Sequence, residues 1–196
     1  MEERSGPLRI LLVEDDSLVV LDLLEELRGL GYEIVGSAAT GTEAIRLARE
    51  LSPDLIILDI KMPELDGLEA AAQITALRPI PMIILSAYSD IPLIERAAHL
   101  GVLAYLVKPV DVRELEATIR VAMSRFREFQ ALRQEVADLR EALETRKLVE
   151  RAKGILMRRR NLTEEEAFRR LQRESQNQNR KIGDIAQAVI AADNLL

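Results

Sequence analysis

The sequence predicts an α/β domain, a parallel sheet of five strands with helices on both faces, followed by a helical connector and a small all-α domain. Short and nearly continuous apolar runs alternate with amphipathic stretches over residues 1–125, as expected for parallel strands buried on both faces. Residues 126–196 show helical patterns alone. With 196 residues, the chain exceeds a common domain of roughly 100–150 residues, so we expect two units.

Five apolar runs are predicted to be strands, at 9–13, 34–38, 55–58, 82–85 and 104–107. The stretches between them are predicted to be helices, at 18–30, 42–51, 68–77 and 92–100. Gly31, Pro53 and Gly101 follow three of these helices, and both residue types commonly end a helix. Repeated strand–helix units imply right-handed crossovers and a doubly wound sheet.

Polar side chains gather where four of the predicted strands end. Glu14 and Asp15 follow the first strand, Asp59 the third, Ser86 the fourth and Lys108 the fifth. Sites in such folds lie at the carboxyl ends of the strands, so we expect these residues to share one pocket. Carboxylates that face each other repel unless a cation lies between them, and oxygen ligands suit Mg²⁺. The next residue, Asp16, is predicted to begin a helix instead.

The motifs LLVEDD, LDIKMPELDG, LSAYS and YLVKP occur in this order. Over residues 8 to about 125 the sequence therefore resembles the receiver domains of two-component response regulators. This resemblance implies a flavodoxin-like sheet of strand order 2-1-3-4-5. It also implies that Asp59 accepts a phosphoryl group from a sensor histidine kinase, with Mg²⁺ as the cofactor.

The same resemblance implies a role for each pocket residue. Glu14, Asp15 and Asp59 would hold the metal, Lys108 would bind the phosphoryl group, and Ser86 with Tyr105 would form the switch pair. The Lys108–Pro109 peptide bond is expected to be cis. Lys61 and Tyr88 would tune the rate of dephosphorylation.

A long helix is predicted from Val112 onward, because the sequence has no Gly or Pro until Gly154. Its apolar residues are spaced four and three apart, but the register shifts by one residue after Phe129. A local break, or a change of packing partner, is expected there. We expect Leu115 to Ala122 to pack on the sheet and Leu132 to Leu143 to seek a partner helix, either in a homodimer or in a folded-back output domain. The apolar residues before the shift are Leu115, Ile119, Ala122, Phe126 and Phe129, and those after it are Leu132, Val136, Leu139 and Leu143.

The C-terminal region is predicted to form three helices around a small core. Thr163 and Glu166 have the spacing of a capping box, which would begin a helix over 164–175. The run 176–179, Gln-Asn-Gln-Asn, is interpreted as a polar turn. Apolar residues at 155–157 and 182–190 supply the flanking helices.

The runs ERAKGILMRRRNLTEEEAF and LQRESQNQNRKIGDIAQAVI in this region resemble the ANTAR family, small three-helix RNA-binding domains of antitermination regulators. The resemblance implies binding to RNA stem-loops that compete with a transcription terminator. We expect a receiver domain at 1–124, a helical, coiled-coil-like connector at 125–145 and an ANTAR-like domain at 146–196.

The charge distribution agrees with a nucleic-acid partner for the second domain. Residues 1–125 hold 12 Lys and Arg against 21 Asp and Glu, whereas residues 146–181 hold 12 against 5. Positive charge suits a phosphate backbone, and amide side chains suit base edges. The candidate RNA-binding residues are Lys153, Arg158, Arg159, Arg160, Gln176, Asn177, Arg180 and Lys181. A DNA-binding response regulator and a protein-interaction module remain alternatives.

Composition excludes several other classes. The chain has no Cys and a single His, so a disulfide framework, a thiol metal site and a histidine cluster are excluded. No apolar run approaches the roughly 18 residues of a membrane span, and no secretory segment appears. We expect a cytoplasmic regulator with no membrane partner, and no enzyme, because no catalytic constellation appears beyond the self-phosphorylation pocket.

Overall fold

The computed structural model describes residues 6–87 and 90–193. Its contacts divide the chain into two compact units, Met1–Phe129 and Gln130–Leu196, and each unit is described by itself. Within the described residues, no helix is both long enough and apolar enough to cross a membrane.

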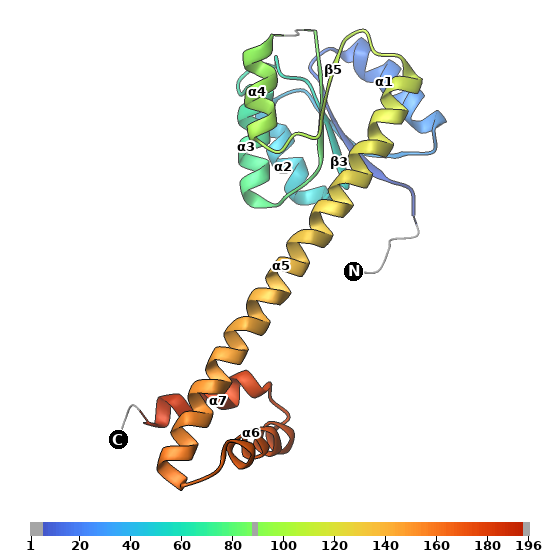
Figure 1. Ribbon diagram of the computed structural model, residues 1–196. Coiled ribbons are helices and arrows are strands. Elements are labelled where there is room, and N and C mark those ends of the chain that lie inside the picture. Colours follow the sequence, from blue (N-terminus) through green and yellow to red (C-terminus); the bar gives the residue numbers. More distant parts are fainter. Residues whose placement is uncertain (1–5, 88–89, 194–196) are drawn as a thin grey trace. The chain divides into compact units, whose positions relative to one another are not determined.

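A five-stranded parallel sheet forms the centre of the first unit (Figure 1). The strand order is β2-β1-β3-β4-β5, which confirms the predicted 2-1-3-4-5 arrangement. All four neighbouring pairs are parallel. The strands are β1 (Arg9–Val13), β2 (Glu33–Ala38), β3 (Leu55–Leu58), β4 (Met82–Ser86) and β5 (Ala104–Val107).

Helices cover both faces of this sheet, with α1 and the start of α5 on one face and α2, α3 and α4 on the other (Figure 1). The bounds are α1 (Ser17–Gly29), α2 (Gly41–Leu51), α3 (Gly67–Leu77), α4 (Ile91–His99) and α5 (Val112–Arg160). The central strands β3 and β4 are buried along their whole length, which explains their apolar sequences.

Three polar side chains set where helices of this unit begin. Asp16, Thr40 and Asp66 are the N-cap residues of α1, α2 and α3, and each accepts a hydrogen bond from a backbone N–H of the first turn. Such caps satisfy donors that have no partner within the helix. The prediction that Asp16 begins a helix is confirmed, and the cap turns its carboxylate toward the Leu18 amide.

The helix α5 is continuous from Val112 to Arg160, so the predicted break near Phe129 is wrong. The prediction that Leu115, Ile119 and Ala122 pack on the sheet is confirmed, because all three are buried in the core of the first unit. The change to a second packing partner stays a prediction. From Phe129 to Leu143 the apolar side chains are exposed. The shift of the apolar pattern thus marks the end of a buried face and not the end of a helix.

The second unit packs the end of α5 against α6 (Glu164–Gln178) and α7 (Ile182–Asp193). Its small core includes Ala152, Leu171 and Ala186, all at most 1% exposed. The capping box of Thr163 and Glu166 is present, as predicted. The predicted turn at 176–179 is wrong, because α6 continues through Gln178 and ends at Asn179 in the left-handed conformation, with φ of 50°.

Candidate functional site

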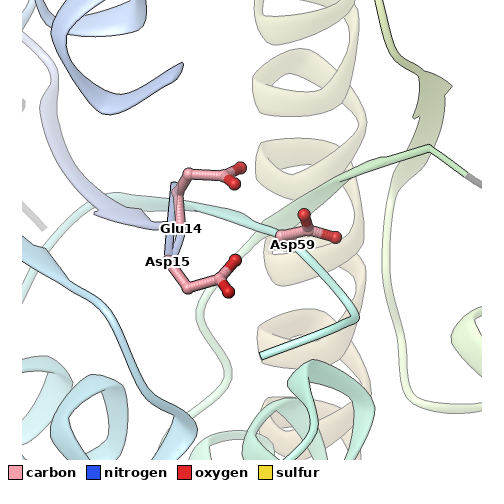
Figure 2. Close-up of side chains that lie close together, drawn as sticks. All are labelled: Glu14, Asp15 and Asp59. Carbon is pink, nitrogen blue, oxygen red and sulfur yellow. The ribbon is translucent and has the colours of Figure 1, made fainter. Parts of the chain in front are cut away.

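The backbone places the predicted pocket residues at one edge of the sheet. The Asp59 amide donates to the Val13 carbonyl at 2.9 Å, and the Lys108 amide donates to the Ser86 carbonyl at 2.9 Å. These ladder bonds hold the ends of neighbouring strands side by side. Three acidic side chains therefore converge, and carboxylate oxygens of Glu14, Asp15 and Asp59 all lie within 4.8 Å of one another (Figure 2).

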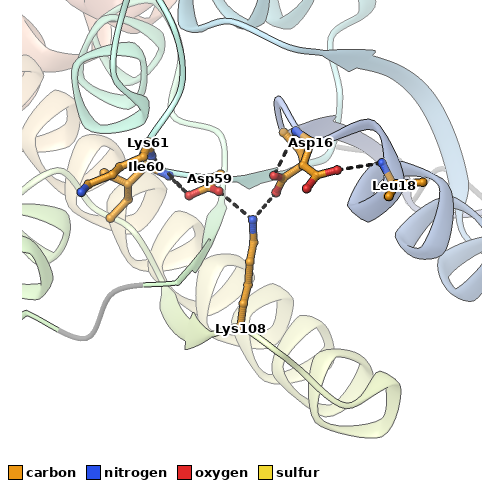
Figure 3. A network of polar contacts seen from close by, with 7 residues as sticks. Asp16, Leu18, Asp59, Ile60, Lys61 and Lys108 are labelled. Carbon is orange, nitrogen blue, oxygen red and sulfur yellow. Dashed lines mark hydrogen bonds and ion pairs between the residues drawn. The ribbon is translucent and has the colours of Figure 1, made fainter.

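The Lys108 ammonium lies between two of these carboxylates (Figure 3). Its Nζ donates to Glu14 Oε2 at 2.5 Å and to Asp59 Oδ2 at 2.6 Å. The Lys108–Pro109 peptide bond is cis, as expected. Burial alone would lower the pKa of Lys108, but hydrogen bonds to Asp59 and Glu14 outweigh it and raise the pKa above its ordinary value.

The acidic residues differ in exposure. Glu14 and Asp59 are 3% and 8% exposed, whereas Asp15 is exposed. Burial raises the pKa of the Glu14 carboxyl, although the bond from Lys108 lowers it in part. Buried carboxylates need cationic partners, so this cluster suits a hard cation in addition to the lysine.

The other oxygen of Asp59 faces the loop that follows β3. Oδ1 accepts from the Ile60 amide at 2.5 Å and from the Lys61 amide at 3.3 Å (Figure 3). The hollow beside it is lined by Asp15, Ile60, Lys61, Met62, Pro63, Asp66 and Leu93. Asp59 therefore lies between the Lys108 ammonium and a loop whose residues help to line an open hollow.

Two further predicted residues lie on the neighbouring strands β4 and β5. Ser86 is fully buried at the end of β4, and Tyr105 is half-buried on β5. Tyr88 falls outside the described residues.

Gly67, the first residue of α3, lies very close to the loop that follows β3. A Cβ atom on Gly67 would lie 2.0 Å from the Asp59 carbonyl oxygen and 2.9 Å from the Ile60 Cα. The Gly67 amide also donates to the Ile60 carbonyl at 2.7 Å. The start of α3 thus packs directly against the backbone of Asp59. The only trace of this contact in the sequence is the glycine itself.

The candidate RNA-binding residues are spread over the second unit, and Lys153 differs from the rest. Its side chain is 10% exposed, and its Nζ pairs with Glu164 Oε1 at 2.7 Å and Glu150 Oε1 at 2.9 Å. The Lys153 ammonium thus joins α5 to the start of α6.

The other candidates are exposed. Arg159 pairs with Asp193 at 2.8 Å and Lys181 with Glu141 at 2.7 Å. Arg180 donates to the Gln178 side chain at 3.3 Å. The three arginines lie in the last turn of α5, Gln176 and Asn177 in the last turn of α6, and Arg180 and Lys181 between α6 and α7.

Comparison with known proteins assigns both units to families. The family model of the response regulator receiver domain matches residues 10–120, and that of the ANTAR domain matches residues 137–190. The chain is 48% identical over 184 residues to the transcriptional regulatory protein PdtaR of Mycobacterium tuberculosis, covering 94% of this chain and 90% of that protein.

Solved structures match the receiver part. The signal receiver domain of a modulated diguanylate cyclase from Desulfovibrio desulfuricans is 34% identical with a TM-score of 0.58, covering 61% of this chain and 96% of that one. A CheY-like receiver domain protein from Methanospirillum hungatei is 27% identical with a TM-score of 0.59, covering 63% and 98%. The chain therefore belongs to the two-component response regulators, with a receiver domain followed by an ANTAR domain.

Proposed function

We propose that a sensor histidine kinase phosphorylates the chain on Asp59, and that phosphorylation controls RNA binding and transcription antitermination by the ANTAR domain. The observation that carries the first part is the position of Asp59, with Lys108 at 2.6 Å and two further carboxylates beside it. The second part rests on the ANTAR match and on the relative named as a transcriptional regulator. The protein would act in the cytoplasm.

The donor set fits Mg²⁺, since Glu14, Asp15 and Asp59 offer three carboxylate oxygens and the adjoining cleft leaves room for water and phosphoryl oxygens. Such an ion would neutralise charge on the phosphoryl group. An Asp59 oxygen would form a bond to phosphorus as the bond to the donor nitrogen breaks. The Lys108 ammonium would then pair with a phosphoryl oxygen.

Labelling with acetyl phosphate and Mg²⁺ tests the acceptor. One phosphoryl group is expected on the wild-type chain, and none on Asp59→Ala. Asp16→Asn is the matched control, because it removes a neighbouring charge and keeps an N-cap side chain for α1. Full labelling of Asp59→Ala, or full labelling after chelation of Mg²⁺, would show that the assignment is wrong.

RNA is the proposed ligand of the second unit because cationic and amide side chains are exposed on its surface at the ends of α5 and α6. A gel shift with stem-loop RNA, against duplex DNA of equal charge, separates the three possible outputs. Preference for RNA supports antitermination. Preference for DNA would favour a DNA-binding regulator, and binding to neither would favour a protein-interaction module.

We also propose that a second copy of the chain pairs with α5. The side chains Leu132, Val136, Leu139 and Leu143 are between 44% and 63% exposed and follow the four-three spacing of a coiled-coil seam. Packing of these exposed side chains against the same seam of a second α5 helix would remove apolar surface from water and so stabilise a dimer.

A further inference from the structure

Gly154 lies within α5 at a position where the described part of the chain gives no steric reason for a glycine. Val149 and Ala152 on neighbouring turns are buried against α6 and α7. A Cβ atom on Gly154 would meet one atom within 4 Å, the Arg158 Nη1, at an ordinary contact distance of 3.7 Å. A glycine inside a helix is destabilising relative to alanine, so this position carries a cost that internal packing does not explain.

The residues that share this face of the helix are basic. Lys147 lies seven residues before Gly154, Arg151 lies three residues before it, and Arg158 lies four residues after it. This spacing places the three side chains on the same side of an α-helix as Gly154. All three are exposed, and they span about 16 Å of helix at 1.5 Å per residue. The glycine thus interrupts a row of cations.

Little within the described residues neutralises this row. Arg151 and Arg158 have no ion pair within residues 6–87 and 90–193. Lys147 pairs with Glu144, but both side chains are more than 60% exposed, and such a pair is weak. The acidic neighbour Glu150 is held by Lys153 at 2.9 Å. The face therefore presents net positive charge to solvent.

We propose that this face of α5, centred on Gly154, is where the phosphate backbone of a folded RNA lies closest to the protein. The absence of a Cβ would let the sugar-phosphate chain approach the helix backbone, while Lys147, Arg151 and Arg158 pair with phosphates on either side. This inference rests on the proposed RNA-binding function and gives its surface. Lys153 contributes by fixing α6 against α5, because its ammonium is already paired.

A second copy of the chain is the competing occupant, since glycine also permits close packing of two helices. The charges oppose this: in a symmetric pair, Lys147, Arg151 and Arg158 would face their own copies, and like charges at close range are destabilising. Phosphates complement the same row. The observations therefore favour the nucleic acid.

The test uses the full chain, treated with acetyl phosphate, and labelled RNA stem-loops with one fixed stem and a randomised loop. Gly154→Ala should bind about tenfold more weakly, with an unfolding midpoint equal to or above that of the wild type. The matched control is Gly29→Ala. It too adds a methyl group to a helix where nothing lies within 4 Å, and it should leave RNA affinity unchanged.

Two charge-reversal variants test whether RNA binds to this face of α5. Arg151→Glu and Arg170→Glu change the net charge equally, and both side chains are exposed, one on α5 and one on α6. Arg151→Glu should weaken binding at least tenfold and lower the log–log salt slope by about one or more, whereas Arg170→Glu should change affinity about twofold at most.

Each other outcome overturns a distinct statement. If the wild type binds RNA and both Gly154→Ala and Arg151→Glu bind equally well, this surface is wrong and the proposed function stands. If the wild type binds no stem-loop, the proposed function itself fails. If Gly154→Ala changes the mass in sedimentation but not RNA affinity, the glycine serves packing between copies.

Discussion

Gly67 shows how a single backbone contact supports the phosphorylation pocket. Because its Cβ position overlaps the Asp59 carbonyl oxygen at 2.0 Å, Gly67→Ala must displace either α3 or the loop that carries Asp59. We expect the free energy of unfolding to fall by about 1–3 kcal/mol and the rate of labelling by acetyl phosphate to fall as well. Denaturant titration and phosphoryl incorporation measure the two effects.

Gly29→Ala is the control for this change, since its Cβ meets nothing within 4 Å. Its stability should be equal to or above that of the wild type. Equal stability and equal labelling of Gly67→Ala would contradict the packing argument.

Ser86 offers a test of how the pocket signals. It is fully buried beside the Lys108 backbone, and a phosphoryl oxygen on Asp59 could draw its hydroxyl inward, leaving space for the Tyr105 ring. Such a movement would shift a two-state equilibrium. Ser86→Ala should still be labelled on Asp59 but should lose most of the phosphorylation-dependent change in RNA affinity. Gel shifts before and after labelling measure this, and a full response in the variant would remove Ser86 from the mechanism.

The contact between α5 and α6 predicts a pH effect on the second unit. Hydrogen bonding to Lys153 lowers the pKa of Glu164 below its ordinary value of 4.5, so the carboxylate stabilises the fold above pH 4.5. This contribution is lost as the pH falls through the lowered pKa. Glu164→Gln should therefore lower the thermal unfolding midpoint at neutral pH, with a smaller difference from the wild type in strong acid. A constant difference over this pH range would contradict the pairing.

Glu165→Gln is the matched control on the neighbouring residue. Its ion pair with Arg169 lies on the surface, with both side chains at least 68% exposed, and such pairs contribute little. The unfolding midpoint of this variant should stay close to that of the wild type.

The elements that local chemistry decides could be predicted from the sequence. Buried parallel strands require apolar runs, and caps such as Asp16 and Thr163 act on their own first turn, so both leave short-range signals. The location of the pocket could also be predicted, because the strand order brings the carboxyl ends of these strands together. The C-terminal end of α6 was not predicted. Gln is a good helix former, and the helix ends only at Asn179, where the Ser175 hydroxyl donates to the Arg180 carbonyl.

Two further features depended on packing that the sequence does not show locally. The continuity of α5 through Phe129 could not be inferred from its apolar spacing. Apolar spacing indicates which face of a helix is buried, and it does not show whether the helix backbone continues. The burial of Lys153 was also missed. It follows Val149 by four residues and lies beside the core, where a lysine is accommodated only with carboxylate partners.

The single helix α5 supplies residues to both units, so its exposed apolar seam bears on the whole molecule. We expect Leu139→Glu with Leu143→Glu to abolish self-association, because burying unpaired carboxylates in a coiled-coil seam is strongly unfavourable. The helix content should remain, since Glu is a good helix former and both side chains are more than half exposed in the single chain. Sedimentation, before and after phosphorylation, measures the mass.

The control for this pair is Leu77→Glu, which places a charge on an equally exposed apolar residue, 54% exposed at the end of α3. It should leave the mass unchanged. Asp59 labelling by acetyl phosphate should also survive the seam substitutions, because the pocket is complete within one chain. A loss of RNA affinity together with self-association would mean that two ANTAR domains bind one RNA jointly. Unchanged mass in the seam variant would instead show that the exposed leucines pair with something other than a second copy.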